Sequence, residues 1–278
     1  MGKRLADITP ATVESWAERE EKIRPTAARL SLRLLRAFFT WCAKQDEYKN
    51  LFDGNPAANP DAREALGQPE AKKDVLIKAQ LPVFFEAAQG LANPVIAAYI
   101  QALLLTGARP GELLALKWSD INTRWKSLTI RDKDESKGGK DGTRTIPLTP
   151  YVHHLLAGLP RRTEWVFSSD TLNQPIAPPH KRLADVARVA GLDITFHGLR
   201  RSYSSLSEWM ETMPVGVVAQ IQGHKPSATA EKHYKPRELG LLQIHADRFE
   251  AWILEQAGIE FDPAQQPGAL RVVAGREA

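Results

Sequence analysis

Cysteine is almost absent from this chain, and long apolar runs are missing altogether. The 278 residues contain a single cysteine, Cys42, which excludes an internal disulfide framework and a cysteine-ligated zinc site. The longest apolar stretch, residues 95–105, is interrupted by Gln101 and is far shorter than the ~20 residues that span a bilayer. No secretory signal pattern follows Met1. We therefore expect a soluble, cytoplasmic protein with no membrane partner.

The overall composition is that of a globular protein with a slight excess of positive charge. Hydrophobic residues make up 43% of the chain, and 37 basic residues against 33 acidic ones give a net charge of +4. This composition excludes wholesale disorder, and the length is enough for about two domains. The mild basic bias is compatible with an anionic partner but does not require one.

Apolar periodicity divides the chain into four parts. Residues 1–51 form a small helical domain, residues 52–74 a proline-rich linker, residues 75–258 a catalytic-sized domain, and residues 259–278 a flexible tail. Two helices are expected within 8–48, the second with a broad apolar face of Leu30, Leu32, Leu34, Leu35, Phe38, Phe39 and Trp41. Further helices are expected over 79–91, 94–105, 110–117, 149–158, 178–190, 196–209, 214–222, 228–235 and 239–257, and strands over 127–131, 144–148 and 164–168. The predicted fold class is mainly α (α+β), with one small three-stranded sheet.

Arg109 is the first of several side chains suited to binding a phosphate. Gly107 breaks one helix and Pro110 begins the next, so Arg109 projects from a helix N-terminal junction, where free backbone N–H groups favour an anion. The ordinary alternative is a surface arginine that pairs with Glu112.

The segment 194–206 offers a second pair of candidate residues. Thr195 can cap a helix whose core-facing stripe is Leu199, Tyr203 and Leu206. His197 and Arg200 lie three residues apart on another face, so both can reach one ligand. A guanidinium fits two phosphate oxygens, and an imidazole can donate a hydrogen bond or carry a proton. A solvated polar pair is the competing interpretation.

Two further segments add a histidine, a tyrosine and two lysines. Gly223 ends a helix and leaves His224 in the following turn, and Tyr234 lies ten residues further on. Taken alone, that tyrosine is most simply a packing residue. Lys137 and Lys140 lie in a predicted β-turn, from which an ammonium can extend into a groove, although a solvated charged hairpin is the simpler reading.

Together, and in this order, these elements resemble the tyrosine recombinase (phage integrase) family. The resemblance covers about 75–257 and rests on the arginine box at Arg109, the sheet lysine, His-x-x-Arg at 197–200, Gly-His at 223–224 and the terminal tyrosine. The stretch 223–234, GHKPSATAEKHY, is most similar to integrases of phages and integrative elements. The resemblance makes residues 1–51 the core-binding domain of a DNA clamp. This part is shorter than usual in the family, and both a complete and a truncated domain stay open.

The resemblance also implies a mechanism that uses neither metal, ATP nor any other cofactor. Arg109, Arg200 and His224 would bind the non-bridging oxygens of the scissile phosphate, and Tyr234 would attack to form a 3′-phosphotyrosine bond. His197 would help to accept the tyrosine proton. Lys137 would protonate the departing 5′-oxygen, with Lys140 as the alternative.

The implied partner is double-stranded DNA at attachment sites, on which the family assembles as a tetramer. Accessory DNA-bending or directionality proteins are candidates for further partners. Residues 180–237 carry nine Lys/Arg against five Asp/Glu, which concentrates positive charge in the segment that contains most of the candidate residues. Two other functions stay open: a type IB topoisomerase that relaxes supercoils with the same chemistry, and a DNA-binding relative that has lost catalysis.

Overall fold

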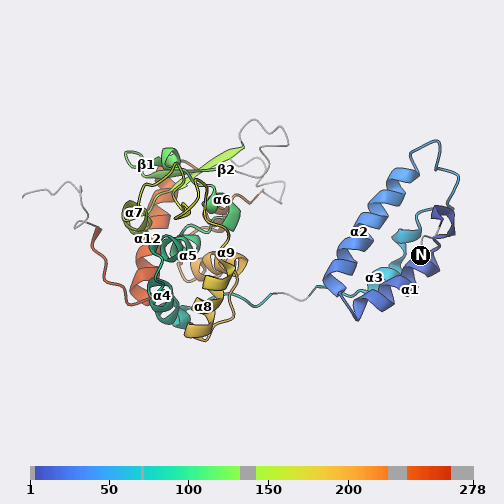
Figure 1. The fold of residues 1–278 in the computed structure, drawn as a ribbon, viewed down its shortest axis with the longest axis horizontal. Helices are drawn as coiled ribbons and strands as arrows, with labels where there is room; N and C mark the ends of the chain where they lie inside the picture. The colour runs from blue at the N-terminus through green and yellow to red at the C-terminus, as the bar shows by residue number, and fades with distance from the viewer. Residues whose placement is uncertain (1–3, 70–71, 132–141, 225–236, 264–278) are drawn as a thin grey trace, which may run out of the picture. The chain divides into compact units, whose positions relative to one another are not determined.

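The computed structural model describes residues 4–69, 72–131, 142–224 and 237–263 (Figure 1). The chain forms two compact units, Met1–Lys72 and Lys73–Ala278, and each has a hydrophobic core of its own. Within the described ranges, no helix combines the length and the apolar character needed to cross a bilayer.

The first unit is entirely helical. It contains η1 (Leu5–Asp7), α1 (Pro10–Glu21), α2 (Pro25–Cys42), η2 (Pro56–Ala58) and α3 (Pro60–Ala65). The two longer helices are those predicted from the sequence. α1 begins with Pro10, and the Thr9 hydroxyl accepts a hydrogen bond from Thr12 N at 3.2 Å, so the predicted cap is present.

Much of the segment 52–74, expected to be a linker, folds as part of this first unit. Ala57, Ala62 and Leu66 are buried in its core, and α3 packs against α1. The prolines that suggested a linker begin short helices instead, because proline is well tolerated at the first helical position. The Asn59 side chain caps α3 by accepting from Asp61 N at 2.9 Å.

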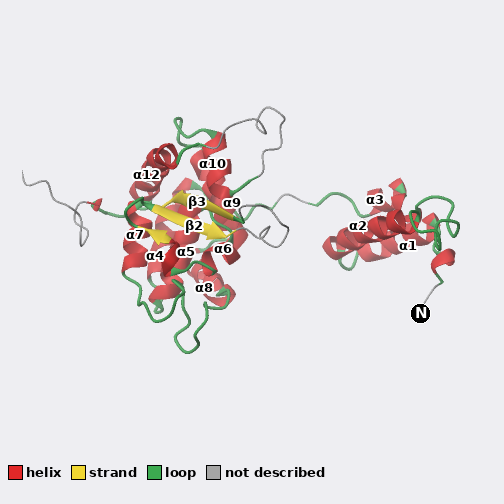
Figure 2. Cartoon of the chain, turned by 90° about the horizontal axis from the view of Figure 1, so that it is seen from above, coloured by secondary structure: helices red, strands yellow, loops and turns green. Residues whose placement is uncertain are grey.

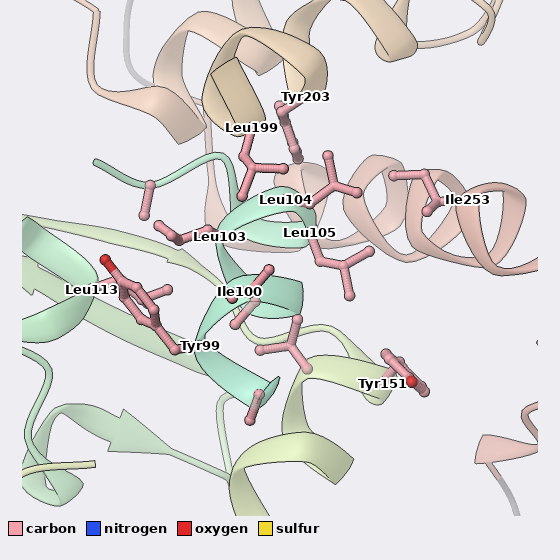
Figure 3. Close-up of a cluster of buried hydrophobic side chains, with 14 of the residues drawn as sticks. Tyr99, Ile100, Leu103, Leu104, Leu105, Leu113, Tyr151, Leu199, Tyr203 and Ile253 are labelled. Atoms are coloured by element: carbon pink, nitrogen blue, oxygen red, sulfur yellow. The ribbon is translucent and has the colours of Figure 1, made fainter. Parts of the chain in front are cut away.

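The second unit is built around one buried central helix, α5 (Pro94–Thr106). Its elements are η3 (Lys78–Gln80), α4 (Leu81–Gln89), α5 (Pro94–Thr106), α6 (Pro110–Leu114), η4 (Trp118–Asp120), β1 (Ile121–Asn122), β2 (Ser127–Arg131), β3 (Thr143–Pro147), α7 (Pro150–Ala157), α8 (His180–Ala190), α9 (Phe196–Ser207), α10 (Val215–Gln222) and α12 (Leu239–Gln256). α5 is buried all round from residue 97 to residue 106, as expected for a helix that is apolar on every side. Figure 3 shows Tyr151, Tyr203 and Ile253, from α7, α9 and α12, gathered around it.

A small antiparallel sheet lies in this unit, and its strands β2 and β3 are drawn in yellow in Figure 2. The strand order of the sheet is β1-β2-β3. β2 and β3 are the predicted strands, and they pair with Ile130 opposite Arg144. The third predicted strand, 164–168, was wrong: this segment makes only isolated bridges to two different partners, Lys117 and Pro175. The third strand of the sheet is β1 instead.

The C-terminal elements pack on their own unit. Leu242, Phe249 and Ile253 of α12 are buried in its core. The flexible tail expected from residue 259 begins with packed residues, because the ring of Phe261 lies 5.1 Å from that of Tyr151.

The first residues of the second unit form hydrogen bonds with α9 and its N-terminal cap. Asp74 is buried, and its carboxylate accepts hydrogen bonds from the hydroxyl of Thr195 and the guanidinium of Arg201. Leu76 N donates to the Ser202 hydroxyl at 2.8 Å. The first residues of this unit are thereby attached to both the N-terminal cap and the middle of α9.

Candidate active site

Two tight turns create the framework of the site. α5 ends at Gly107, whose φ of +59° is readily adopted only by glycine. A Cβ atom at this position would lie 2.8 Å from Tyr203 Cγ, so the turn after α5 also requires glycine to pass against α9. α10 ends in the same way at Gly223, with φ +69°.

Arg200 connects these two turns. Its Nη1 donates to the carbonyl of Gly107 at 2.6 Å, and its Nη2 donates to the carbonyl of Gln222 at 2.7 Å. The Gln222 side chain donates back to the Arg200 carbonyl at 2.8 Å. Only 8% of Arg200 is exposed, so the solvated polar pair considered for 197–200 does not describe this arginine.

Arg109, which precedes α6, reaches the second of these turns. It is the N-cap of α6, the helix junction predicted from the sequence, and its Nη2 donates to the Gly223 carbonyl at 3.4 Å. Its Nη1 also forms an ion pair with Glu112 at 2.5 Å. The ion pair considered as the simple alternative therefore exists, but it is not an exposed one: the Glu112 side chain is 2% exposed.

Glu112 and Arg144 are the two charged residues of this region that the sequence did not single out as site residues. Arg144 of β3 binds the Glu112 carboxylate with both terminal nitrogens, at 3.0 and 2.7 Å. Burial acts to raise the pKa of Glu112, but hydrogen bonds and positive charge from Arg144, and then from Arg109, lower it below its usual value. Glu112 is therefore an ionised carboxylate shared by two arginines.

His224 follows directly after the second turn and is exposed. Partial burial of its imidazole lowers its pKa, and the nearby guanidinium groups of Arg200, Arg109 and Arg144 lower it further. These effects favour the neutral imidazole, in which one nitrogen can donate and the other can accept.

Of the remaining predicted site residues, the structure describes His197. His197 is exposed in the first turn of α9, and the Thr195 hydroxyl caps this helix as predicted, accepting from Gly198 N at 3.0 Å. Lys137, Lys140 and Tyr234 lie outside the described residues. The structure thus brings together Arg109, Arg200 and His224 around two turns.

This arrangement can bind an anion with groups held in advance. The two guanidinium groups are fixed by main-chain carbonyls and by Glu112, so they need little reorganisation when negative charge arrives. Among the described residues, no group of three or more His, Cys, Asp or Glu side chains could hold a metal ion.

Comparison with protein families matches both units. Residues 1–64 match the phage integrase core-binding domain, and residues 75–238 match the phage integrase family. Prophage integrase IntF of Escherichia coli is 42% identical over 266 residues, which are 92% of this chain and 55% of IntF. Tyrosine recombinase XerA of Pyrococcus furiosus is 28% identical over 213 residues, which are 73% of this chain and 67% of XerA.

Solved structures share the fold at low sequence identity. Lambda integrase, crystallised as a dimer bound to a core site, is 19% identical with a TM-score of 0.63, and the match covers 84% of each chain. The integrase of transposon Tn1549, solved with transposon right-end DNA, is 17% identical with a TM-score of 0.66, and the match covers 90% of this chain and 88% of that one.

The chain spans 55% of IntF and 65% of prophage integrase IntZ of Escherichia coli, so it corresponds to a part of these curated relatives. Within that part, the family matches include the segments that contain Arg109, Arg200 and His224. From these matches and from the 42% identity to IntF, we conclude that the chain belongs to the phage integrase family.

Proposed function

We propose that this chain cuts and rejoins DNA as a tyrosine-type site-specific recombinase. The observation that carries the proposal is the convergence of Arg109 and Arg200 on the carbonyls of the two turns at 107 and 222–223, with His224 directly beyond. The site thereby offers fixed donors for a phosphodiester, whose non-bridging oxygens gain negative charge as the nucleophile attacks.

The proposed reaction exchanges one phosphoester bond for another. The Tyr234 oxygen forms a bond to phosphorus while the bond to the 5′-oxygen breaks, and the DNA 3′-phosphate stays on the tyrosine. His197 helps to accept the tyrosine proton, and Lys137 gives a proton to the 5′-oxygen. Attack by the 5′-hydroxyl of another strand reverses these steps and reseals the DNA, so no external energy source is needed.

DNA binding by the first unit is supported by a row of arginines. Arg29, Arg33 and Arg36 follow helical spacing along α2 and, with Arg63 of α3, line a groove of about 750 Å³. Arg33 and Arg36 are exposed, whereas Arg29 donates to the Leu66 carbonyl at 2.8 Å. Exposed guanidinium groups in such a row can neutralise successive phosphates of a duplex.

Similarity to integrases favours strand exchange over the relaxation of supercoils by a type IB topoisomerase. Lambda integrase has been solved as a tetramer bound to a Holliday junction, and we extend that assembly to this chain as part of the proposal. The partner is double-stranded DNA at the attachment sites of a phage or mobile element, in the cytoplasm of a prokaryotic host.

The direct test is to trap the covalent intermediate on nicked duplexes from the ends of the host element. Wild-type protein should give an adduct that survives SDS. Tyr234→Phe should give none while DNA affinity stays within a few-fold, because only the nucleophilic oxygen is lost. An adduct formed by the Phe variant would show that another residue is the nucleophile, and relaxation of a plasmid without an attachment site would favour the topoisomerase.

A further inference from the structure

Arg144 has three connections within the site. Its two terminal nitrogens bind Glu112 in a fork, and its Nε donates to the carbonyl of Ile221 at 3.1 Å. The side chain is 14% exposed, against 2% for Glu112. A planar fork of this kind fixes its partner in direction as well as in distance.

The Arg144 side chain also lies against the turn that leads to His224. A Cβ atom added to Gly223 would meet Cδ, Nε and Cζ of Arg144, each at 3.0 Å. The turn and the guanidinium therefore pack directly on each other. Movement of Arg144 would change the support of the Gly223 carbonyl, which accepts from Arg109.

Glu112 provides a second connection between Arg144 and Arg109. Its carboxylate accepts from the Arg109 backbone N at 2.9 Å and from Arg109 Nη1 at 2.5 Å. Without Arg144, this buried carboxylate would lose two of its donors. Because a buried carboxylate needs compensation, it would then draw more strongly on Arg109.

Arg144 thus touches both supports of Arg109 and the turn before His224. We propose that Arg144 is a positioning residue for strand cleavage, which holds Arg109 and His224 where the scissile phosphate binds. This inference rests on the proposed function. Arg144 acts through Glu112 and the turn at 221–223.

A matched control lies on the neighbouring strand. Arg131 of β2 forms a two-point ion pair with Asp120, at 2.8 Å for each hydrogen bond, and its Nη1 lies 3.4 Å from the Ala115 carbonyl. It therefore resembles Arg144 in chemistry and in strand context, but its partners are outside the site. Arg131→Gln should lower stability without a specific effect on the phosphate.

The experiment measures single-turnover cleavage of two nicked duplexes by wild type, Arg144→Gln, Arg144→Lys, Arg131→Gln and Arg109→Ala. One duplex carries the ordinary scissile phosphate, and the other carries a methylphosphonate, which lacks the negative charge. Both Arg144 variants should slow cleavage of the ordinary phosphate by about 10²-fold, as a misplaced catalytic group does. On the methylphosphonate this defect should shrink at least tenfold, as for Arg109→Ala, because a neutral centre depends less on a placed guanidinium. A defect of equal size on both duplexes would overturn the inference.

A second measurement needs no reaction. The pKa of the His224 imidazole, followed by NMR in the free protein, should rise in Arg144→Gln, which removes one of the three positive charges facing it, and should stay unchanged in Arg131→Gln. Arg144→Lys keeps the charge but loses the fork, so it should slow cleavage while shifting this pKa less. If wild type forms no adduct, the proposed function fails and this inference falls with it, whereas a wild type that cleaves while Arg144→Gln behaves like Arg131→Gln would overturn the inference alone. An unchanged His224 pKa in Arg144→Gln would overturn it.

Discussion

The guanidinium of Arg200 donates to the carbonyl of Gly107 at 2.6 Å, although 93 positions separate the two residues in the chain. This bond holds the end of α5 against α9, and Gln222 connects the same arginine to the end of α10. Arg200 therefore supports the turns on which the site is built, and in the proposed reaction it has a second task, which is to offer positive charge to the phosphate.

Because Arg200 also supports the fold, replacing it should destabilise the protein more than replacing Arg109. Arg200→Ala removes the guanidinium that donates to the carbonyls of Gly107 and Gln222, so the free energy of unfolding, measured in urea, should fall by about 1–3 kcal/mol. Arg109→Ala should lower the free energy of unfolding by less, because Glu112 keeps Arg144 as its partner.

Each of these two variants should slow cleavage by about 10²–10³-fold. DNA affinity, measured in parallel, should fall far less, since many phosphate contacts share it. Equal losses in rate and affinity would assign both arginines to DNA positioning.

The general acid can be identified by changing the leaving group. Replacing the bridging 5′-oxygen with sulfur gives a thiolate, which departs without a proton. Lys137→Ala should therefore slow cleavage of ordinary DNA by about 10²–10⁴-fold and regain most of the rate on the sulfur substrate. Arg109→Ala, the control, should not recover, because its charge acts on the non-bridging oxygens. Selective recovery of Lys140→Ala in place of Lys137→Ala would make Lys140 the acid.

Stability should depend on pH through Glu250 of α12. Burial, assisted by the charge of Asp247, raises its pKa from 4.5 to about 7, although the Thr149 hydroxyl and two backbone N–H groups donate to it. The folded state then holds a proton that the unfolded chain releases, so stability falls as pH rises from about 4.5 to 7, by up to about 3 kcal/mol.

Thermal unfolding across this pH range measures the effect. Glu250→Gln should remove most of the slope, whereas Glu255→Gln, an exposed position on the same helix, should leave it intact. The same slope in wild type and Glu250→Gln would show that another group is responsible.

Salt dependence tests the arginine row of α2. Each phosphate contact that is lost should reduce the slope of log affinity against log salt by about 0.9, so the double variant Arg33→Ala/Arg36→Ala should lower it by nearly 2. Arg4→Ala is a suitable control in the same unit, since Arg4 pairs with Asp7 at 3.0 Å outside this row. An unchanged slope in the double variant would remove α2 from the DNA interface.

The elements that local sequence signals describe were predicted well. Thr195 caps α9, and Leu199, Tyr203 and Leu206 are buried along it, because capping and apolar spacing are properties of one short segment. The broad apolar face of α2 was only partly right. Phe39 is buried, whereas Leu34 and Trp41 are 61% and 51% exposed, since a unit of so few helices covers only one side of α2.

The contact between Glu112 and Arg144 could not be predicted from local sequence signals. Glu112 and Arg144 meet across 32 positions because β3 pairs with β2, which packs against α6, and neither residue carries a local signal of that contact. From the sequence, Glu112 was considered only as the partner of Arg109 in a surface ion pair. Its burial, which turns a surface pair into a shared internal carboxylate, depends on tertiary packing.

The attachment of Asp74 to α9 has a mechanical consequence. Asp74 is the second residue of the second unit, and it is bonded to the cap of the helix that carries His197 and Arg200. Displacement of Asp74 therefore either breaks these hydrogen bonds or moves the N-terminal cap of α9 with it. The start of the second unit is thereby coupled to the orientation of the helix that carries His197 and Arg200.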